Sequence, residues 1–103
     1  MLFELSIIPL GKDTHLSGEI AEVMKIIDGA GFLYQLTPSG TCIEGGWEEV
    51  MVLIKKCHEQ MRERSPHVIT TIKIEDEEGG QNKLTKNVES IEEKVGKKLS
   101  RTK

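Results

Sequence analysis

The sequence is poor in the residues on which several small-domain chemistries depend. Its 103 residues include two cysteines, one tryptophan, one tyrosine and two phenylalanines. Its three arginines are Arg62, Arg64 and Arg101, so the first half of the chain has none. RNA-recognition domains stack bases on strand aromatics, soft-metal carriers pair thiolates in their first loop, and acyl-phosphate hydrolases need an early arginine. The scarcity of these residues argues against all three classes.

Charge and hydropathy exclude two further kinds of partner. The net charge of −3 argues against non-specific nucleic-acid binding, which needs a basic surface. Apolar runs are far shorter than the roughly 20 residues of a membrane span. The first residues, MLFELSIIPLG, carry Glu4 and no basic group, which predicts a strand rather than a signal peptide. We therefore expect a cytoplasmic protein whose Cys42 and Cys57 are reduced.

Hydrophobic periodicity divides the chain into four strands and three helices. Residues 2–10 and 67–75 alternate between apolar and polar positions, as strands with one buried face do. Pro66 ends the second helix, because a residue before proline avoids the helical conformation. A polar turn is expected at residues 11–15 and a frayed tail at 98–103. The predicted strands are 2–10, 32–37, 40–45 and 67–75, and the predicted helices are 16–29, 47–64 and about 82–97.

This order of elements predicts a fold. The first six elements read β-α-β-β-α-β, which is the ferredoxin-like split arrangement of the α+β class. In it, two helices cover one face of a four-stranded antiparallel sheet, with strand order 4-1-3-2. We expect residues 1–103 to form a single domain of this kind, with the third helix as an addition. Because this fold hosts many functions, it does not by itself identify one.

Catalytic and metal-binding patterns find no support. The three histidines, His15, His58 and His67, lie on separate elements without metal-ligand spacing. Cys57 and His58 are neighbours on a helix, so their side chains diverge by about 100° and form no nucleophile–base pair. The chain contains no Gly-x-Gly-x-x-Gly and no Walker sequence. We expect no enzyme activity, no metal and no cofactor.

Two segments carry a resemblance. The first is E-L-S-I-I-P-L-G at residues 4–11, and the second is P-S-G-T-C-I-E-G at residues 38–45, followed by T-I-K-I at residues 71–74. In this order they resemble the small thiamine-binding protein family, the single-domain relatives of the YkoF-type thiamine-binding proteins. The resemblance extends from Leu2 to about Val95. The chain departs from it at Ser39, where relatives often have methionine, and after the last strand, where relatives often have an arginine and this chain has none.

The resemblance implies a ferredoxin-like homodimer or homotetramer that binds thiamine (vitamin B1) or a related aminopyrimidine without catalysis. The residues present suit such a ligand. A carboxylate can accept from the amino group and balance the thiazolium charge, hydroxyls can bind the ring edge, and Tyr34 or Trp47 can form a flat wall. Because no phosphate cradle is evident, free thiamine is preferred to its diphosphate. The candidate ligand-binding residues are Glu4, Ser6, Thr37, Ser39, Thr41, Glu44 and Thr71.

Ordinary structural roles for these residues stay open. Glu4 and Ser6 fit the exposed face of any antiparallel sheet, and turn chemistry explains residues 37–40. Glu44 fits a charge near the positive end of the following helix, and Trp47 fits a core anchor. Two alternatives to thiamine binding therefore remain: a structural or regulatory oligomer with no thiamine ligand, and an enzyme acting on thiamine precursors.

Overall fold

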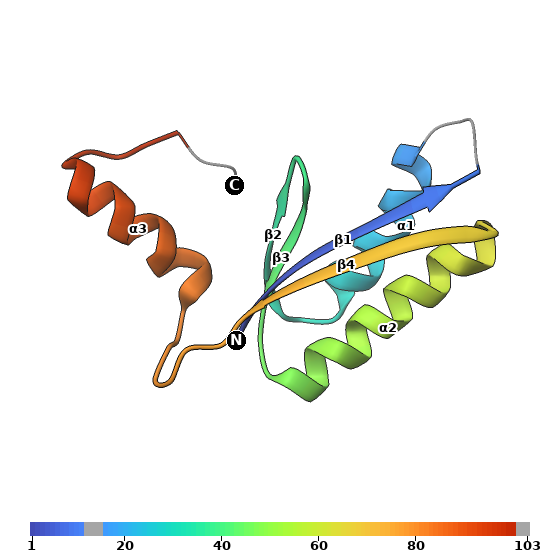
Figure 1. Cartoon of the computed structure of the whole chain (residues 1–103), viewed down its shortest axis with the longest axis horizontal. Helices are drawn as coiled ribbons and strands as arrows, with labels where there is room; N and C mark the ends of the chain where they lie inside the picture. Colours follow the sequence, from blue (N-terminus) through green and yellow to red (C-terminus); the bar gives the residue numbers. More distant parts are fainter. Residues whose placement is uncertain (12–15, 101–103) are drawn as a thin grey trace.

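A computed structural model describes residues 1–11 and 16–100 of the chain (Figure 1). The predicted turn at residues 11–15 and the end of the predicted tail, residues 101–103, lie largely outside the described residues. The predicted order of strands and helices is confirmed. The elements are β1 (Leu2–Leu10), α1 (Leu16–Gly29), β2 (Leu33–Thr37), β3 (Gly40–Glu44), α2 (Trp47–Arg64), β4 (His67–Glu75) and α3 (Lys83–Val95).

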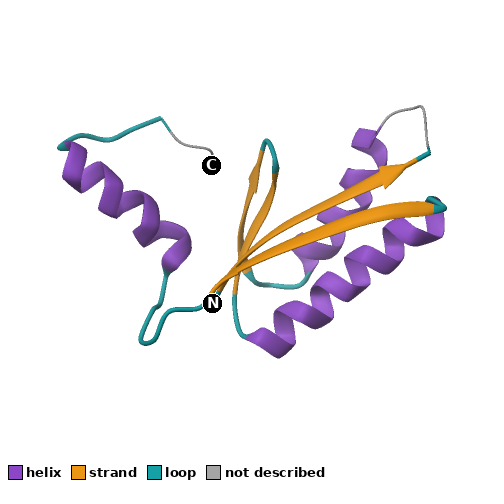
Figure 2. Cartoon of the chain, viewed as in Figure 1, coloured by secondary structure: helices purple, strands orange, loops and turns teal. Residues whose placement is uncertain are grey.

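The four strands form one antiparallel sheet in the order β2-β3-β1-β4, as predicted, and α1 and α2 pack on one face of it (Figure 2). Alternation along each strand divides the side chains between a core face and an open face. In β1, Phe3 and Leu5 are buried whereas Glu4 is exposed. The core consists of residues from β1, β3, α1 and α2: Phe3, Leu5, Val23, Ile27, Ile43, Val50, Leu53, Ile54, Cys57 and Met61.

One serine ties the end of α2 to strands β1 and β4. Ser65 is 2% exposed, and its hydroxyl lies 3.0 Å from the carbonyl oxygen of Leu10 and 2.9 Å from that of His67. The next residue, Pro66, stops the helix, so the chain turns directly into β4. This contact holds the far ends of β1 and β4 against the helix layer.

The β2–β3 hairpin lies close against β1. Thr37 pairs with Gly40, which leaves Pro38 and Ser39 as a two-residue turn. A side chain at position 40 would not fit, because its Cβ would lie 2.5 Å from the carbonyl oxygen of Leu5. Glycine is therefore required there for the close approach of the two backbones.

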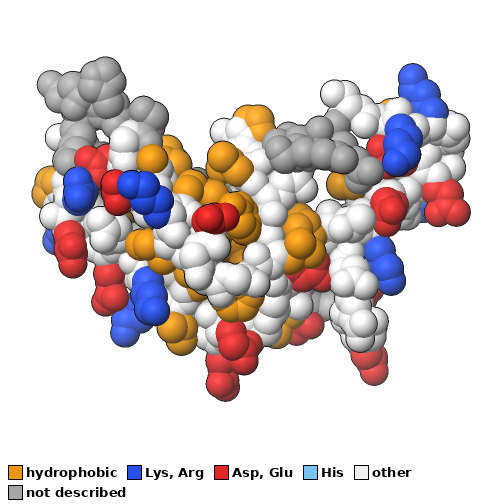
Figure 3. Space-filling view, turned by 180° about the vertical axis from the view of Figure 1, so that it is seen from behind, with side chains coloured by type: hydrophobic (Ala, Val, Ile, Leu, Met, Phe, Trp, Pro, Cys, Tyr) orange, Lys and Arg blue, Asp and Glu red, His pale blue; other side chains and the backbone are white. Residues whose placement is uncertain are grey.

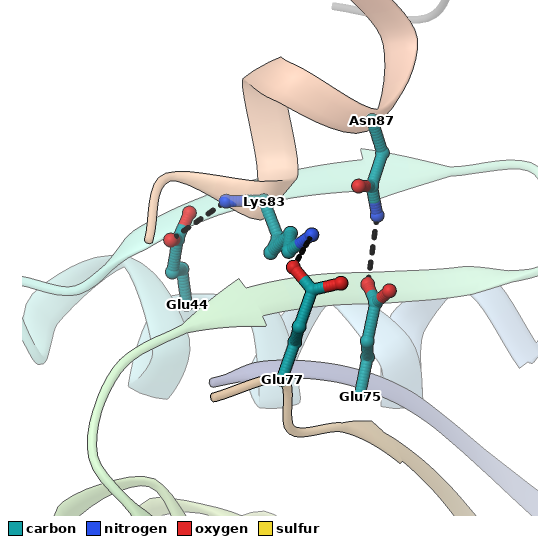
Figure 4. Close-up of polar contacts among 5 residues, drawn as sticks. All are labelled: Glu44, Glu75, Glu77, Lys83 and Asn87. Atoms are coloured by element: carbon teal, nitrogen blue, oxygen red, sulfur yellow. Dashed lines mark hydrogen bonds and ion pairs between the residues drawn. The ribbon is translucent and has the colours of Figure 1, made fainter. Parts of the chain in front are cut away.

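The third helix stands apart from the two-layer domain and is anchored at its N-terminus (Figures 1 and 4). The carboxylate of Glu44 accepts hydrogen bonds from the backbone N–H groups of Lys83 and Leu84, at 3.0 and 3.2 Å. Asn87 donates to Glu75 at 2.8 Å, and Lys83 pairs with Glu77. A carboxylate is suited to the N-terminus of a helix, where free N–H groups and the helix dipole attract negative charge.

The apolar side of α3 is only partly covered. Leu84 and Val88 are half-buried, but Ile91 and Val95 are 58% and 54% exposed. Trp47 is not the buried core anchor that it resembled in the sequence, because it is 51% exposed. Its ring lies beside that of Phe3, with the two ring centroids 6.3 Å apart. It begins α2 at the end of the sheet, where the core is not deep enough to enclose an indole.

Glu44 supports α3 rather than α2, and this role can be tested by replacing it with glutamine. Glu44→Gln removes the charge and one of the two acceptor oxygens, so α3 should open more easily, by about 1–3 kcal/mol. Hydrogen exchange of the amides in Lys83–Val95 should then accelerate by about tenfold or more, since 1.4 kcal/mol is a factor of ten.

A matched control is Glu59→Gln, which changes an exposed carboxylate of α2 and should leave α3 exchange unchanged. Equal exchange in wild type and Glu44→Gln would show that the carboxylate does not hold α3. The amides of α2 should keep their protection in both variants.

Candidate functional site

The structure distributes most of the candidate site residues over two cavities. Ser6, Thr37, Ser39 and Thr41 line one cavity, next to the hairpin turn. Glu4 lines a second cavity on the open face. Thr71 and Glu44 line neither of them among the described lining residues. Four of the seven candidates therefore line one cavity, and the other three do not line it.

The first cavity, here called the hairpin cavity, exists because β1 is longer than β3. Strand β3 pairs with β1 only from Leu2 to Leu5, whereas β4 pairs with β1 as far as Leu10. Beyond Leu5, β1 therefore extends past the hairpin, and α1 lies on the core side of the gap. The resulting cavity has a volume of about 350 Å³, near the lower end of the roughly 300–1,000 Å³ typical of ligand pockets.

The hairpin cavity has a buried apolar floor and a half-exposed apolar rim. Figure 3 shows apolar side chains gathered between the hairpin and the α1 side of the molecule. The rim is formed by Ile8, Ile20 and Leu36, which are 46%, 39% and 49% exposed. The floor residues are each at most 6% exposed: Leu5, Val23, Ile27, Thr41 and Met61.

Thr41 provides the polar group of the floor. It lies opposite Leu5 in the sheet, so its side chain is on the core face and is 5% exposed. Its hydroxyl donates to the sulfur of Met24 at 3.4 Å. A thioether is a weak acceptor, so a ligand nitrogen or oxygen would be a better partner for this buried hydroxyl. At the turn, Thr37 donates to the carbonyl oxygen of Gly40 at 3.0 Å and keeps its own oxygen as an acceptor.

The second cavity, here called the open-face cavity, lies between the sheet and α3 and differs in chemistry. Its volume is about 470 Å³. Glu4 faces Cys42 on β3 and Lys73 on β4 across the strands. Its lining includes both signs of charge: Leu2, Glu4, Cys42, Lys73, Ile74, Glu75 and Asn87.

Neither cysteine is prepared for nucleophilic chemistry. Burial raises the pKa of the Cys42 thiol, nearby Glu4 raises it further and Lys73 partly opposes them. Burial raises the pKa of Cys57 to about 11. Both thiols are therefore mostly protonated at neutral pH, and the thiolate is the reactive form.

Three other candidates do not line the hairpin cavity among its described residues. Glu44 accepts hydrogen bonds from the N-terminal N–H groups of α3, whereas the N-cap of α2 makes no side-chain hydrogen bond. Tyr34 donates to Asp28 at 2.6 Å, and this hydrogen bond raises the pKa of the phenol. Thr71 is exposed on β4, opposite Ser6. Neither Tyr34 nor Trp47 is among the described residues that line the hairpin cavity.

No sequence pattern marked the four α1 residues that line the hairpin cavity. Ile20, Val23, Met24 and Ile27 have the spacing of an ordinary buried helix stripe. Only the shortness of β3 leaves part of this stripe facing a space instead of a strand.

Among the described residues, no group of three or more His, Cys, Asp and Glu is placed to hold a metal ion. Within the same ranges, no helix has the length and apolar character to cross a membrane.

Comparison with known proteins gives one consistent result. The chain is 34% identical to UPF0045 protein YqgV of Bacillus subtilis over 94 residues, covering 85% of this chain and 90% of that protein. It is also 34% identical to a UPF0045 protein of Methanothermobacter thermautotrophicus over 95 residues, covering 89% and 96%.

Solved structures share the fold. A hypothetical protein of Methanocaldococcus jannaschii superposes with a TM-score of 0.82 at 24% identity, covering 89% of this chain and 95% of that one. A Thermotoga maritima protein, provisionally assigned to thiamine biosynthesis or salvage, superposes with a TM-score of 0.72 at 25% identity, covering 92% and 94%. The family described as "Thiamine-binding protein" matches residues 3–92. The chain therefore belongs to the thiamine-binding protein family.

Proposed function

We propose that the protein binds thiamine or a related aminopyrimidine in the hairpin cavity and does not convert it chemically. The observation that carries this proposal is the meeting of Ser6, Thr37, Ser39 and Thr41 around one apolar cavity. An aminopyrimidine offers a flat apolar face and an edge of hydrogen-bonding nitrogens, which matches a lining of apolar and hydroxyl groups. Membership of the family and the thiamine-related Thermotoga relative support the same ligand.

A binding role without catalysis fits the chemistry of the lining. The described residues around the hairpin cavity are apolar or carry hydroxyls. General acid–base catalysis needs a titratable group within hydrogen-bond reach of the reacting atom. The protonated thiols of Cys42 and Cys57 favour binding over nucleophilic chemistry as well. An enzyme acting on thiamine precursors is therefore the weaker alternative.

We also propose that the protein is a cytoplasmic homo-oligomer, a dimer or a tetramer. Ile91 and Val95 on α3, and the cross-strand pair Ile8 and Ile69, are all about half exposed in one chain. Burying a side chain of this size stabilises by roughly 1.5–3 kcal/mol. A second copy of the chain carries the same exposed apolar residues, so two copies can cover one another. The unpaired Cys42 and Cys57 suit a reducing compartment. The same apolar surface favours the second candidate function, a structural oligomer without a thiamine ligand.

Ligand binding predicts a thermal shift that depends on Thr41. A ligand at a hundred times its Kd stabilises the native state by about 2.7 kcal/mol, which raises the Tm of a domain this size by roughly 10–20 °C at about 4–8 °C per kcal/mol. Thr41→Val keeps the shape but removes the hydroxyl, so affinity for thiamine should fall about tenfold. Thr41→Ser should retain most of the affinity. Isothermal calorimetry and differential scanning fluorimetry measure both effects.

Thr71→Val is the control, because Thr71 is not among the described residues that line the hairpin cavity, and it should bind as wild type does. Loss of binding in Thr71→Val with full binding in Thr41→Val would move the site to the open face. No thermal shift at several millimolar of either thiamine or its aminopyrimidine half would favour the structural oligomer. The unfolding transition of each variant without ligand shows whether it is folded.

If the protein is an oligomer, a charge at one apolar position of α3 should lower the mass measured in solution. Light scattering at micromolar concentration should give two or four times the 11.5 kDa of the chain. Ile91→Glu places a charge in the proposed interface and should lower the mass, because burying an unpaired charge is costly. Ser90→Glu introduces the same charge at the neighbouring exposed position and should not. A wild-type mass of 11.5 kDa would contradict the proposal.

A further inference from the structure

The open-face cavity contains two opposite charges that lie next to one another on the sheet. Cys42 on β3, Glu4 on β1 and Lys73 on β4 are directly opposite one another across three adjacent strands. Such cross-strand neighbours have Cβ atoms roughly 4.5–5.5 Å apart. Burial raises the pKa of the Cys42 thiol, Glu4 raises it further and Lys73 lowers it, so the thiol senses both charges. A carboxylate and an ammonium group therefore lie side by side on the sheet side of this cavity.

Neither of these two charges is held by a structural ion pair. Among the described residues, Glu4 and Lys73 form no ion pair with one another, and both are exposed. An ion pair between exposed side chains contributes little to stability, so little is lost when a ligand comes between them. The neighbouring carboxylate, Glu75, is different, because it accepts a hydrogen bond from Asn87 at 2.8 Å. Glu4 and Lys73 are thus the charges of the cavity that can bind a ligand.

Helix α3 supplies the wall of the cavity that lies opposite the sheet. Asn87 extends from α3 toward Glu75, to which it donates a hydrogen bond (Figure 4). A carboxylate only accepts hydrogen bonds, so the amide nitrogen of Asn87 faces Glu75 and its amide oxygen stays available as an acceptor. The cavity has a volume of about 470 Å³, and the aliphatic side chain of Leu2 also lines it. The space between sheet and helix can therefore hold a small molecule with an aliphatic group.

The two charges decide the class of ligand. A simple cation would be attracted by Glu4 and repelled by Lys73, and a simple anion would meet the reverse. A neutral molecule would displace water from both charges without replacing it, which is unfavourable. A zwitterion satisfies both groups, because its ammonium donates to the carboxylate and its carboxylate accepts from the lysine. Hydrogen bonds of this charge-assisted kind are the stronger ones.

We propose that the open-face cavity is a second binding site, which takes a small α-amino acid with an aliphatic side chain. Glu4 and the amide oxygen of Asn87 accept from the α-ammonium group, and Lys73 donates to the α-carboxylate. The aliphatic side chain lies against Leu2, beside Cys42. An α-amino acid carries both charges on the same carbon atom, which suits two protein charges on directly opposite residues. Among their described lining residues, the two cavities share none, so this site does not depend on the function proposed for the hairpin cavity.

Three ligands with the same side chain test which charges are recognised. L-Leucine carries both charges, N-acetyl-L-leucine lacks the ammonium and L-leucinamide lacks the carboxylate. Titrations of the full chain, followed by ¹H–¹⁵N NMR, both measure weak binding and locate it. Millimolar L-leucine should shift the amide signals around Glu4, Cys42, Lys73 and Asn87, and each analogue should bind at least about fivefold more weakly. No shifts with L-leucine, shifts confined to other residues, or an analogue less than about fivefold weaker would overturn the proposal.

Two charge-removing variants match the two analogues. Lys73→Met and Glu4→Gln change exposed side chains, and each should weaken L-leucine binding by about fivefold or more. L-Leucinamide has no carboxylate, so Lys73→Met should not weaken its binding, and Glu4→Gln should likewise not weaken the binding of N-acetyl-L-leucine. Lys55→Met and Glu59→Gln make the same changes on the exposed side of α2 and should bind L-leucine as wild type does. If the α2 variants weaken binding as much as the sheet variants, or if neither pair weakens it, the site is not in this cavity. An unchanged unfolding transition shows that each variant is folded.

Discussion

The close approach of Gly40 to the carbonyl oxygen of Leu5 sets the geometry on which the candidate site depends. It brings the start of β3 against the middle of β1, with room for a backbone and none for a side chain. Because β3 pairs with β1 only as far as Leu5, β1 continues unaccompanied on that side for several residues. The apolar stripe of α1 then faces a cavity in a place where a longer hairpin would have filled the layer. The short hairpin with its two-residue turn thus leaves the space that forms the hairpin cavity.

The sequence was sufficient for the fold because each element carries its own local signal. Alternation in β1 correctly separated Phe3 and Leu5 from Glu4, and Pro66 correctly ended α2. The order of elements then left few ways to bury every apolar face, and the observed sheet is the predicted one. Local periodicity has less to say about Trp47, since its burial depends on how deep the core is at the end of the sheet.

The grouping of the candidate residues was predicted less well. Polar residues on neighbouring strands do not always share a face of the sheet. Glu4 and Thr41 are on adjacent strands, but the register pairs Glu4 with Cys42 and Thr41 with Leu5. Adjacent pairs alternate between the two faces, so a shift of one residue decides which cavity a side chain enters. That register is fixed by packing against α1 and α2 and not by any motif. Met24 and Met61 were missed for a related reason, since a residue that lines a cavity has the same helical spacing as one that fills a core.

The two faces of the sheet differ in chemistry, and α3 is held on the open face. On the helix face, buried apolar groups and one buried hydroxyl surround a small space. On the open face, the carboxylates Glu44 and Glu75 bind backbone and amide groups of α3 rather than a ligand cation. Glu44, a candidate ligand contact in the sequence, and Glu75 thus hold a helix on which Ile91 and Val95 are more than half exposed. The carboxylate of Glu44 on the hairpin strand thus holds α3 on one face, and the cavity on the other face is lined by apolar and hydroxyl groups among its described residues.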